Sequence, residues 1–312
     1  MIGIDVGGAN LKLVDGKRIT LRYCPLWEGA PLGDLLTAFR ATHPDPDAAV
    51  VMSGELADCF GTKLDGIRSI VGSVQEVYPD AIFYGTDGSF HKEPVPQLAA
   101  ANWLAAADLL RMRYPRAVLL DIGSTTTDII PLNRFGELMG LTDLGRLQRG
   151  YLLYTGLLRT PLSTQLPSVR VRGVETPTCA EQFAISADAH LVLGHITPAT
   201  YSCDAPDRGE KNVGAALRRL ARLVCADLDE IGPGEALGIA RQFWEAQRDR
   251  IRAAADRVAS RSGAGTIVVA GIGSSLFARE LGGWDLAREL GAVSDALPAF
   301  AVKEVALREA GS

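Results

Sequence analysis

The chain has 312 residues, 47% hydrophobic and 22% charged, an ordinary balance for a globular protein with a buried core. Its net charge of −5 gives no indication of the basic face that nucleic-acid binding requires, so we expect no nucleic-acid partner. No apolar run reaches the ~18 residues of a membrane span, and five scattered cysteines give no disulfide framework, so a cytoplasmic protein is expected.

The first part of the chain predicts a meander followed by alternating helices and strands. Strands are expected at Ile2–Val6, Leu11–Val14 and Arg18–Tyr23, joined by tight turns. Helices and strands then alternate over Leu32–Arg40, Ala48–Met52, Leu64–Tyr78, Ala81–Tyr84 and Val95–Met112.

The same order then restarts. Strands are expected at Ala117–Ile122 and Asp128–Leu132, with a turn at Asn133–Gly136. Helices are expected over Leu144–Leu157, Ala184–Leu193, Val213–Leu228 and Glu235–Ser260, then a strand at Thr266–Ala270 and helices at Leu276–Leu281 and Pro298–Glu309. We therefore expect two lobes, residues 1–115 and 116–312, the second with an inserted segment around residues 158–212.

An internal repeat supports this duplication. The stretch DVGGANLK (residues 5–12) aligns with DIGSTTTD (residues 121–128), so an Asp ends an apolar strand in both and a Gly follows two residues later. A strand, turn and strand at the start of each half predicts a duplicated α/β fold with a central cleft. Two such turns facing one cleft would form a clamp for a ligand with phosphates.

The residue types of the two turns suit phosphate and Mg²⁺. Glycines let the backbone approach a ligand, and successive N–H groups and hydroxyls can form a nest for an anion. Carboxylates repel phosphate but can hold Mg²⁺ that bridges to it. The predicted phosphate-binding residues are Gly7, Gly8, Asn10, Lys12, Gly123, Ser124, Thr125, Thr126 and Thr127, with Gly271 and Gly273 of the later GIGSS stretch. The predicted metal ligands are Asp5, Asp121 and Asp128.

Two acidic residues that follow strands are the candidates for catalysis. Glu55 follows the strand at Ala48–Met52, and Asp87 follows the strand at Ala81–Tyr84. The carboxyl ends of such strands form the edge at which α/β folds bind ligands, so either residue could act as a general base. Both are also common types for turns and helix caps, and that alternative stays open.

The two turns and GIGSS resemble the phosphate and adenosine motifs of the actin, sugar kinase and heat-shock-70 ATPase superfamily, whose members have a duplicated ribonuclease-H-like fold. Within it, DIGSTTTDIIP is similar to the hydantoinase/oxoprolinase branch. The stretches MSGELAD, AANWLAA, LLYTGLLRTP, ISADAHLVLGHI and YSCDAPD resemble the tetrahydromethanopterin-linked one-carbon transfer pathway family, which includes methanofuran-biosynthesis synthases.

This resemblance implies a transferase that joins an aminomethylfuran-methyl diphosphate to the phenol of a γ-glutamyl-tyramine or γ-glutamyl-tyrosine acceptor and releases pyrophosphate. The clamp would then hold the diphosphate and Mg²⁺, whereas a need for ATP stays open. The alternatives are an ATP-dependent small-molecule kinase, an oxoprolinase-like amidohydrolase and a non-catalytic nucleotide-binding regulator. The expected partners are small molecules, and the sequence does not indicate an oligomeric state.

Overall fold

Two β-sheets form the centre of the computed structural model, which describes residues 1–311. The first sheet comprises β1 (Ile2–Val6), β2 (Asn10–Asp15), β3 (Arg18–Tyr23), β4 (Ala48–Met52), β5 (Ile82–Tyr84) and β6 (Phe90–His91). The second comprises β7 (Ala117–Ile122), β8 (Thr127–Pro131), β9 (Leu152–Leu153), β12 (Thr266–Ala270) and β13 (Trp284–Asp285).

Five strands of the first sheet have the same topology as the five strands of the second, and β6 is an additional strand at the edge of the first sheet. Their strand orders are β3-β2-β1-β4-β5-β6 and β9-β8-β7-β12-β13. In each sheet the first three strands pair antiparallel. The next two strands run parallel to the central strand, β1 or β7. The shared order confirms the expected duplicated, two-lobed α/β fold of the ribonuclease-H-like type.

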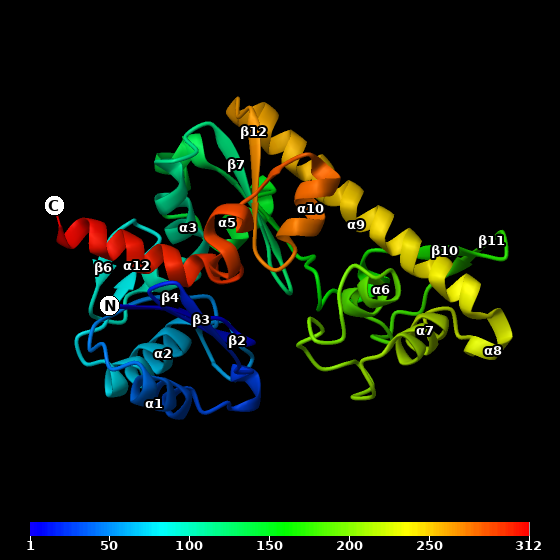
Figure 1. Ribbon diagram of the computed structural model, residues 1–312, viewed down its shortest axis with the longest axis horizontal. Coiled ribbons are helices and arrows are strands. Elements are labelled where there is room, and N and C mark those ends of the chain that lie inside the picture. The colour runs from blue at the N-terminus through cyan, green and yellow to red at the C-terminus, as the bar shows by residue number, and fades with distance from the viewer. Residues whose placement is uncertain (312) are drawn as a thin grey trace.

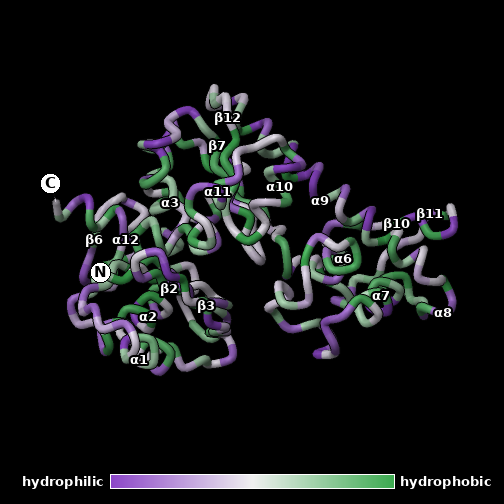
Figure 2. Tube along the Cα trace, viewed as in Figure 1, coloured by the Kyte–Doolittle hydropathy of each residue, from purple (hydrophilic) through white to green (hydrophobic). Residues whose placement is uncertain are grey.

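Apolar residues explain where the sheets and their covering helices lie. All five residues of β1 are buried, as expected for a central strand that is covered on both faces. Helices α1 (Leu32–Thr42) and α2 (Lys63–Val77) pack their apolar side chains against the first sheet, and α10 (Ser274–Leu281) packs against the second. The tube in Figure 2 is hydrophobic along β7 and β12, in agreement with their buried positions.

Helices α3 (Asn102–Arg111) and α12 (Leu297–Ala310) join the two lobes. They pack against each other, and α12 also packs on β1 and β4, although it lies at the C-terminal end of the chain (Figure 1). One hydrophobic cluster includes residues of both helices together with β4, β7, β8 and β12. A single core therefore fixes the position of one sheet relative to the other.

The insert lies beside the second lobe and extends past residue 212, the end expected from the sequence (Figure 1). One hydrophobic cluster lies within it, a second cluster packs it against the second sheet, and the long helix α9 runs from it to that sheet. Its elements are β10 (Ser168–Val171), β11 (Val174–Pro177), α6 (Ser186–Val192), α7 (Val213–Arg222), α8 (Leu228–Ile231) and the first part of α9 (Pro233–Ser262). The short helices α4 (Phe135–Leu138), α5 (Asp143–Arg149) and α11 (Ala287–Leu290) belong to the second lobe.

Four expected spans are wrong, and backbone geometry explains two of them. The helix expected over Val95–Met112 begins only at Asn102, because a 3-10 turn at Pro96–Leu98 and a positive φ of 47° at Ala100 precede it. The helix expected over Leu144–Leu157 ends at Arg149, since Gly150 adopts a left-handed conformation there.

The third wrong span is the turn expected at Asn133–Gly136, which is helical in the structure. The helix expected over Val213–Leu228 is also shorter than predicted, because α7 ends at Arg222. The two-residue strands β6, β9 and β13 were not expected, since such short edge strands leave almost no pattern in a sequence.

Gly3 tests the contact between β1 and α12. A Cβ atom at Gly3 would lie 1.9 Å from the carbonyl oxygen of Ala299, so the two backbones touch. We expect Gly3→Ala to lower the free energy of unfolding by about 1–3 kcal/mol or more, as overpacking does. Denaturant unfolding measures the change.

The control is Gly72→Ala on α2, where an added Cβ would have no neighbour within 4 Å. That change should stabilise the helix by about 0.5–1 kcal/mol. Equal stability of the two variants would contradict the close packing of α12 on β1.

Candidate functional site

The two turns singled out in the sequence have the same local geometry. The Gly7 N–H donates to the carbonyl oxygen of Asn10 over 3.0 Å, and the Gly123 N–H donates to that of Thr126 over 2.9 Å. Each turn joins the first two strands of its sheet. The sequence repeat therefore corresponds to a structural repeat.

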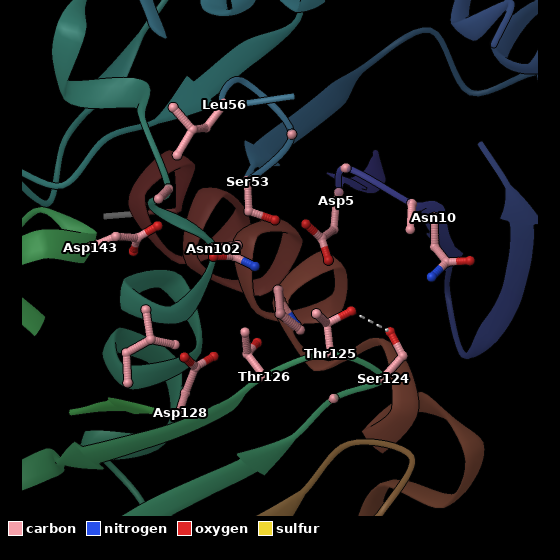
Figure 3. A pocket seen from close by; sticks show the side chains of 18 of the residues that line it. Asp5, Asn10, Ser53, Leu56, Asn102, Ser124, Thr125, Thr126, Asp128 and Asp143 are labelled. Atoms are coloured by element: carbon pink, nitrogen blue, oxygen red, sulfur yellow. Dashed lines mark hydrogen bonds between the residues drawn. The ribbon is translucent and has the colours of Figure 1, made fainter. Parts of the chain in front are cut away.

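Both turns line one cavity of about 430 Å³ between the lobes. Figure 3 shows Asp5 and Asn10 on one side of it and Ser124, Thr125 and Thr126 on the other. The cavity is also lined by Gly7, Gly8, Lys12, Trp27, Ser53, Asn102, Asp121, Gly123, Asp128, Asp143, Arg146, Tyr154, Arg159 and Pro298. The structure thus brings together both predicted turns and all three predicted metal ligands.

The turns offer hydrogen-bond donors to this cavity. Within residues 1–311, the N–H groups of Gly8, Ala9, Ser124 and Thr125 donate to no backbone carbonyl. The hydroxyls of Ser124 and Thr125 lie beside them, 3.5 Å apart. Successive free N–H groups at a glycine turn are a known form of anion site. The geometry therefore suits a phosphate group on each turn.

Asp5 of β1 and Asp121 of β7 each lie opposite a residue of the neighbouring antiparallel strand. Asp5 pairs in register with Lys12, whereas Asp121 pairs with Asp128. The Lys12 ammonium lies 3.8 Å from a carboxylate oxygen of Asp5. The repeat thus places a cation in one lobe at the position where the other lobe has an acid.

Burial perturbs the carboxyls at the centre of the site. Desolvation is the main cause that raises the pKa of Asp5 to about 6 and that of Asp121 to about 7. The Lys12 ammonium opposes this shift in both, and the nearby Asp128 carboxylate adds to it. One oxygen of Asp5 is buried without a hydrogen-bond partner. For both carboxyls, the effect of burial on the pKa therefore outweighs the opposing effect of Lys12.

Arg146 neutralises the third carboxylate. Its guanidinium pairs with Asp128 and, over 2.8 Å, with Asp143. It also lies over the ring of Trp103, 4.4 Å from the centroid, and only 3% of its side chain is exposed. Burial raises the pKa of Asp128, and Arg146 opposes that shift. Asp128 is therefore less available for a metal ion than Asp5 or Asp121.

The segment after β9 supports the turn of the second lobe. The N–H groups of Leu157 and Leu158 donate to the carbonyl oxygens of Gly123 and Ser124 over 2.9 and 3.0 Å. A Cβ atom at Gly156 would lie 2.6 Å from the Thr125 nitrogen, so only glycine fits.

Thr127 belongs to this support and not to the cavity surface. Its side chain is fully buried, and its hydroxyl donates to the carbonyl oxygen of Thr155 over 2.7 Å. Thr127 is absent from the residues that line the cavity. Its predicted role in phosphate binding is therefore corrected to a structural one.

The structure does not bring the two predicted catalytic acids to the cavity surface. Asp87 lies outside the cavity lining and pairs with His91 over 3.0 Å. Glu55 is 1% exposed and lies behind the surface, although its neighbours Gly54 and Leu56 line the cavity. Both acids follow strands as expected, but neither side chain lines the cavity at the carboxyl ends of those strands.

The glycines of GIGSS are explained by packing. A Cβ atom at Gly271 would lie 2.4 Å from a carboxylate oxygen of Asp121, and one at Gly273 would lie 2.5 Å from the Ile122 side chain. Neither glycine lines the cavity. They allow the turn after β12 to approach the end of β7, which corrects their predicted role in phosphate binding.

Sequence reasoning missed several residues that line the cavity, chiefly Trp27, Asp143, Arg146 and Arg159. Arg159 stands in the YTGLLRTP stretch that carried the family resemblance, and this was the one available signal. Nothing in the local pattern marked Arg146, because it looks like an ordinary polar position of a helix.

Comparisons with known proteins identify the family. The chain belongs to the hydantoinase/oxoprolinase family, whose sequence model matches residues 47–293. Within it, the chain is 34% identical over 288 residues to the (4-{4-[2-(gamma-L-glutamylamino)ethyl]phenoxymethyl}furan-2-yl)methanamine synthase of Methanocaldococcus jannaschii, covering 88% of this chain and 87% of the relative. A protein of the same name from Methanococcus vannielii is 38% identical over 159 residues, which are 51% of this chain and 72% of the relative.

Among solved structures, a nucleotide-free acetone carboxylase matches with a TM-score of 0.45 and 12% identity, over 94% of this chain and 51% of that one. The chain thus spans about half the length of that protein.

Within residues 1–311, no helix is both long and apolar enough to cross a membrane.

Asp5→Asn tests the electrostatic strain at the site. Burial raises the folded pKa of Asp5 to about 6, above the ~3.9 of an unfolded chain. Stability from this group is therefore fully present below the unfolded pKa and lost as the pH rises through 6. In ligand-free protein with EDTA, we expect Asp5→Asn to match the wild type near pH 4 and to have the higher Tm at pH 7.5, by calorimetry.

The control for this comparison is Asp80→Asn, at a carboxylate whose side chain is 82% exposed. It should leave the dependence of Tm on pH as in the wild type. A lower Tm for Asp5→Asn at pH 7.5 would show that Lys12 more than offsets the desolvation of Asp5.

Glu55→Gln separates a catalytic from a structural role. Burial raises the pKa of Glu55, and among the residues that the structure describes one of its carboxylate oxygens has no hydrogen-bond partner. Glutamine keeps the shape and an acceptor oxygen, so we expect turnover within about twofold of the wild type, since one lost general base would cost at least ~100-fold. Steady-state kinetics measures it, and a hundredfold loss would restore Glu55 as the base.

Proposed function

We propose that the protein joins an aminomethylfuran-methyl diphosphate to the phenol oxygen of a γ-glutamyl-tyramine or γ-glutamyl-tyrosine acceptor, with release of pyrophosphate. The observation that carries this proposal is one cavity lined by two equivalent anion-binding turns, in a chain similar over most of its length to the archaeal synthase. The name of that relative describes a phenoxymethyl link between a phenyl ring and a furan. Its substrates are small molecules, and we assign the reaction to the cytoplasm.

The reaction exchanges one carbon–oxygen bond for another. The bond between the furan methylene carbon and the diphosphate oxygen breaks, and that oxygen keeps the electron pair. The phenol oxygen bonds to the same carbon, and its proton passes to a carboxylate of the protein. Because the diphosphate is itself the leaving group, the balance needs no ATP.

The turns are suited to the charge that develops on the leaving group. Gly8 and Ala9 line the cavity from the first lobe, and Ser124 and Thr125 line it from the second. Within residues 1–311 their N–H groups donate to no backbone carbonyl, so the two phosphates can be held from both lobes. The Lys12 ammonium adds a point charge on the same surface. Donors that are already in place stabilise developing charge without having to reorganise.

Asp5 fits a magnesium ion. Its carboxylate offers only oxygen atoms, and one of them is buried without a partner among the described residues. No group of three His, Cys, Asp or Glu side chains able to hold a metal occurs in residues 1–311. Mg²⁺ commonly needs only one or two carboxylates together with phosphate oxygens and water. When bound, it would neutralise charge on the diphosphate.

Asp121 is the best placed carboxylate to accept the phenol proton. It lines the cavity, and its pKa is raised to about 7, close to the pH at which a general base works best. Asp128 and Asp143 are both paired with Arg146, so they are weaker bases. Asp121 therefore replaces Glu55 and Asp87 as the proposed base, and Asp5 is left as the principal metal ligand.

The proposed reaction predicts pyrophosphate release that depends on the acceptor. Purified protein with Mg²⁺ and the aminomethylfuran diphosphate, in the absence of ATP, should release pyrophosphate only after γ-glutamyl-tyramine is added. A coupled phosphate assay measures the release, and mass spectrometry measures the ether product. Asp121→Asn should reduce the rate by ~100-fold or more, as expected for a lost general base.

No release in this assay, together with ATP consumption in a parallel reaction, would contradict the proposal. The protein would then belong with the ATP-dependent kinases or amidohydrolases of the same fold.

A further inference from the structure

Trp27 and Arg159 form a contact between the lobes at the cavity. Trp27 lies in the 3-10 turn Leu26–Glu28 of the first lobe, and Arg159 follows the segment that supports the second turn. The guanidinium carbon of Arg159 lies 4.9 Å from the centroid of the Trp27 ring. Both residues line the cavity, so this contact is part of its surface.

The backbone fixes Arg159 beside the phosphate turn. Its N–H donates to the carbonyl oxygen of Ser124 over 2.8 Å. The insert reaches the same place, because the Cys203 thiol lies 3.9 Å from the carbonyl oxygen of Leu158, the residue before Arg159. Arg159 therefore stands where the first lobe, the second lobe and the insert meet, with both Trp27 and Arg159 partly exposed.

The guanidinium of Arg159 has unused donors. Within residues 1–311 it forms no ion pair and no side-chain hydrogen bond. Arg146, the other arginine of the cavity, is paired with Asp128 and Asp143. An arginine stacked on an aromatic face keeps its planar fork of donors free for a carboxylate. The guanidinium of Arg159 can therefore donate hydrogen bonds to an anionic group of a bound ligand.

We propose that Trp27 and Arg159 form the subsite that binds the α-carboxylate of the acceptor's glutamyl group. This inference rests on the proposed function. The diphosphate already has the two turns and Lys12, whereas the acceptor carboxylate has no other unpaired arginine among the described residues that line the cavity. Trp27 holds the guanidinium plane, and Arg159 donates to the two carboxylate oxygens.

The experiment compares two acceptors that differ only in this carboxylate. They are γ-glutamyl-tyramine and 4-aminobutanoyl-tyramine, which lacks the α-carboxylate. For Arg159→Ala we expect the KM for γ-glutamyl-tyramine to rise about 10- to 100-fold, as for a lost hydrogen bond to a charged group. We expect its kcat, and the KM for the diphosphate, to stay within about twofold, because the interaction contributes to binding alone.

The second acceptor completes a double-mutant-type cycle, in which the wild type and Arg159→Ala are each measured with both acceptors. In the wild type, 4-aminobutanoyl-tyramine should already show the raised KM, and Arg159→Ala should not raise it further. Arg159→Lys keeps the charge but loses the fork of donors, so its KM should be intermediate. Arg68→Ala, at a side chain 60% exposed on α2, is the control and should match the wild type with both acceptors.

Three results would overturn the inference. Equal loss with both acceptors, together with a raised KM for the diphosphate, would assign Arg159 to the leaving group. Unchanged kinetics in Arg159→Ala would show that the side chain binds neither substrate. In both cases the wild type still forms the ether, so the proposed function stands, whereas no product from the wild type with either acceptor would remove both.

Discussion

Two carboxylates held at equivalent points of a duplicated fold determine the character of this site. Asp5 and Asp121 are the second-to-last residues of the central strands β1 and β7, and both line one cavity from opposite lobes. Their pKa values are raised to about 6 and 7 because they are buried with Lys12 as the nearby cation. The packing of α3 and α12 between the sheets holds them there. A ligand that brings a cation or proton donors relieves this strain, so binding is coupled to the state of these two groups.

The two halves of the duplicated fold carry different charges at equivalent positions, so the two sides of the cavity differ in charge. Lys12 and Asp128 occupy the same register position in the two sheets. Asp128 is neutralised by Arg146, which lies on Trp103. Arg159 lies on Trp27 and has no ion-pair partner among residues 1–311. The cavity therefore has one arginine that serves its own carboxylates and one that is free for a ligand. A substrate with an anion at each end has only one favourable orientation in such a cavity.

The sequence predicted those features that depend on short stretches of chain. The strands β1, β3, β4, β7 and β12 were located correctly, and the repeat of residues 5–12 in residues 121–128 predicted the pairing of the two turns. Features that depend on distant contacts could not be predicted. Gly271 and Gly273 look alike whether a phosphate or the end of β7 is nearby. Arg146 and Arg159 gain their roles from Trp103 and Trp27, which are far away in the chain.

The most direct test of the duplicated clamp is a crystal structure of the protein with Mg²⁺ and pyrophosphate. We expect the pyrophosphate to contact residues 7–10 and residues 123–126 together, with the metal ion on Asp5. Pyrophosphate bound to one turn alone, or outside the cavity between the lobes, would contradict the clamp and the reaction proposed from it.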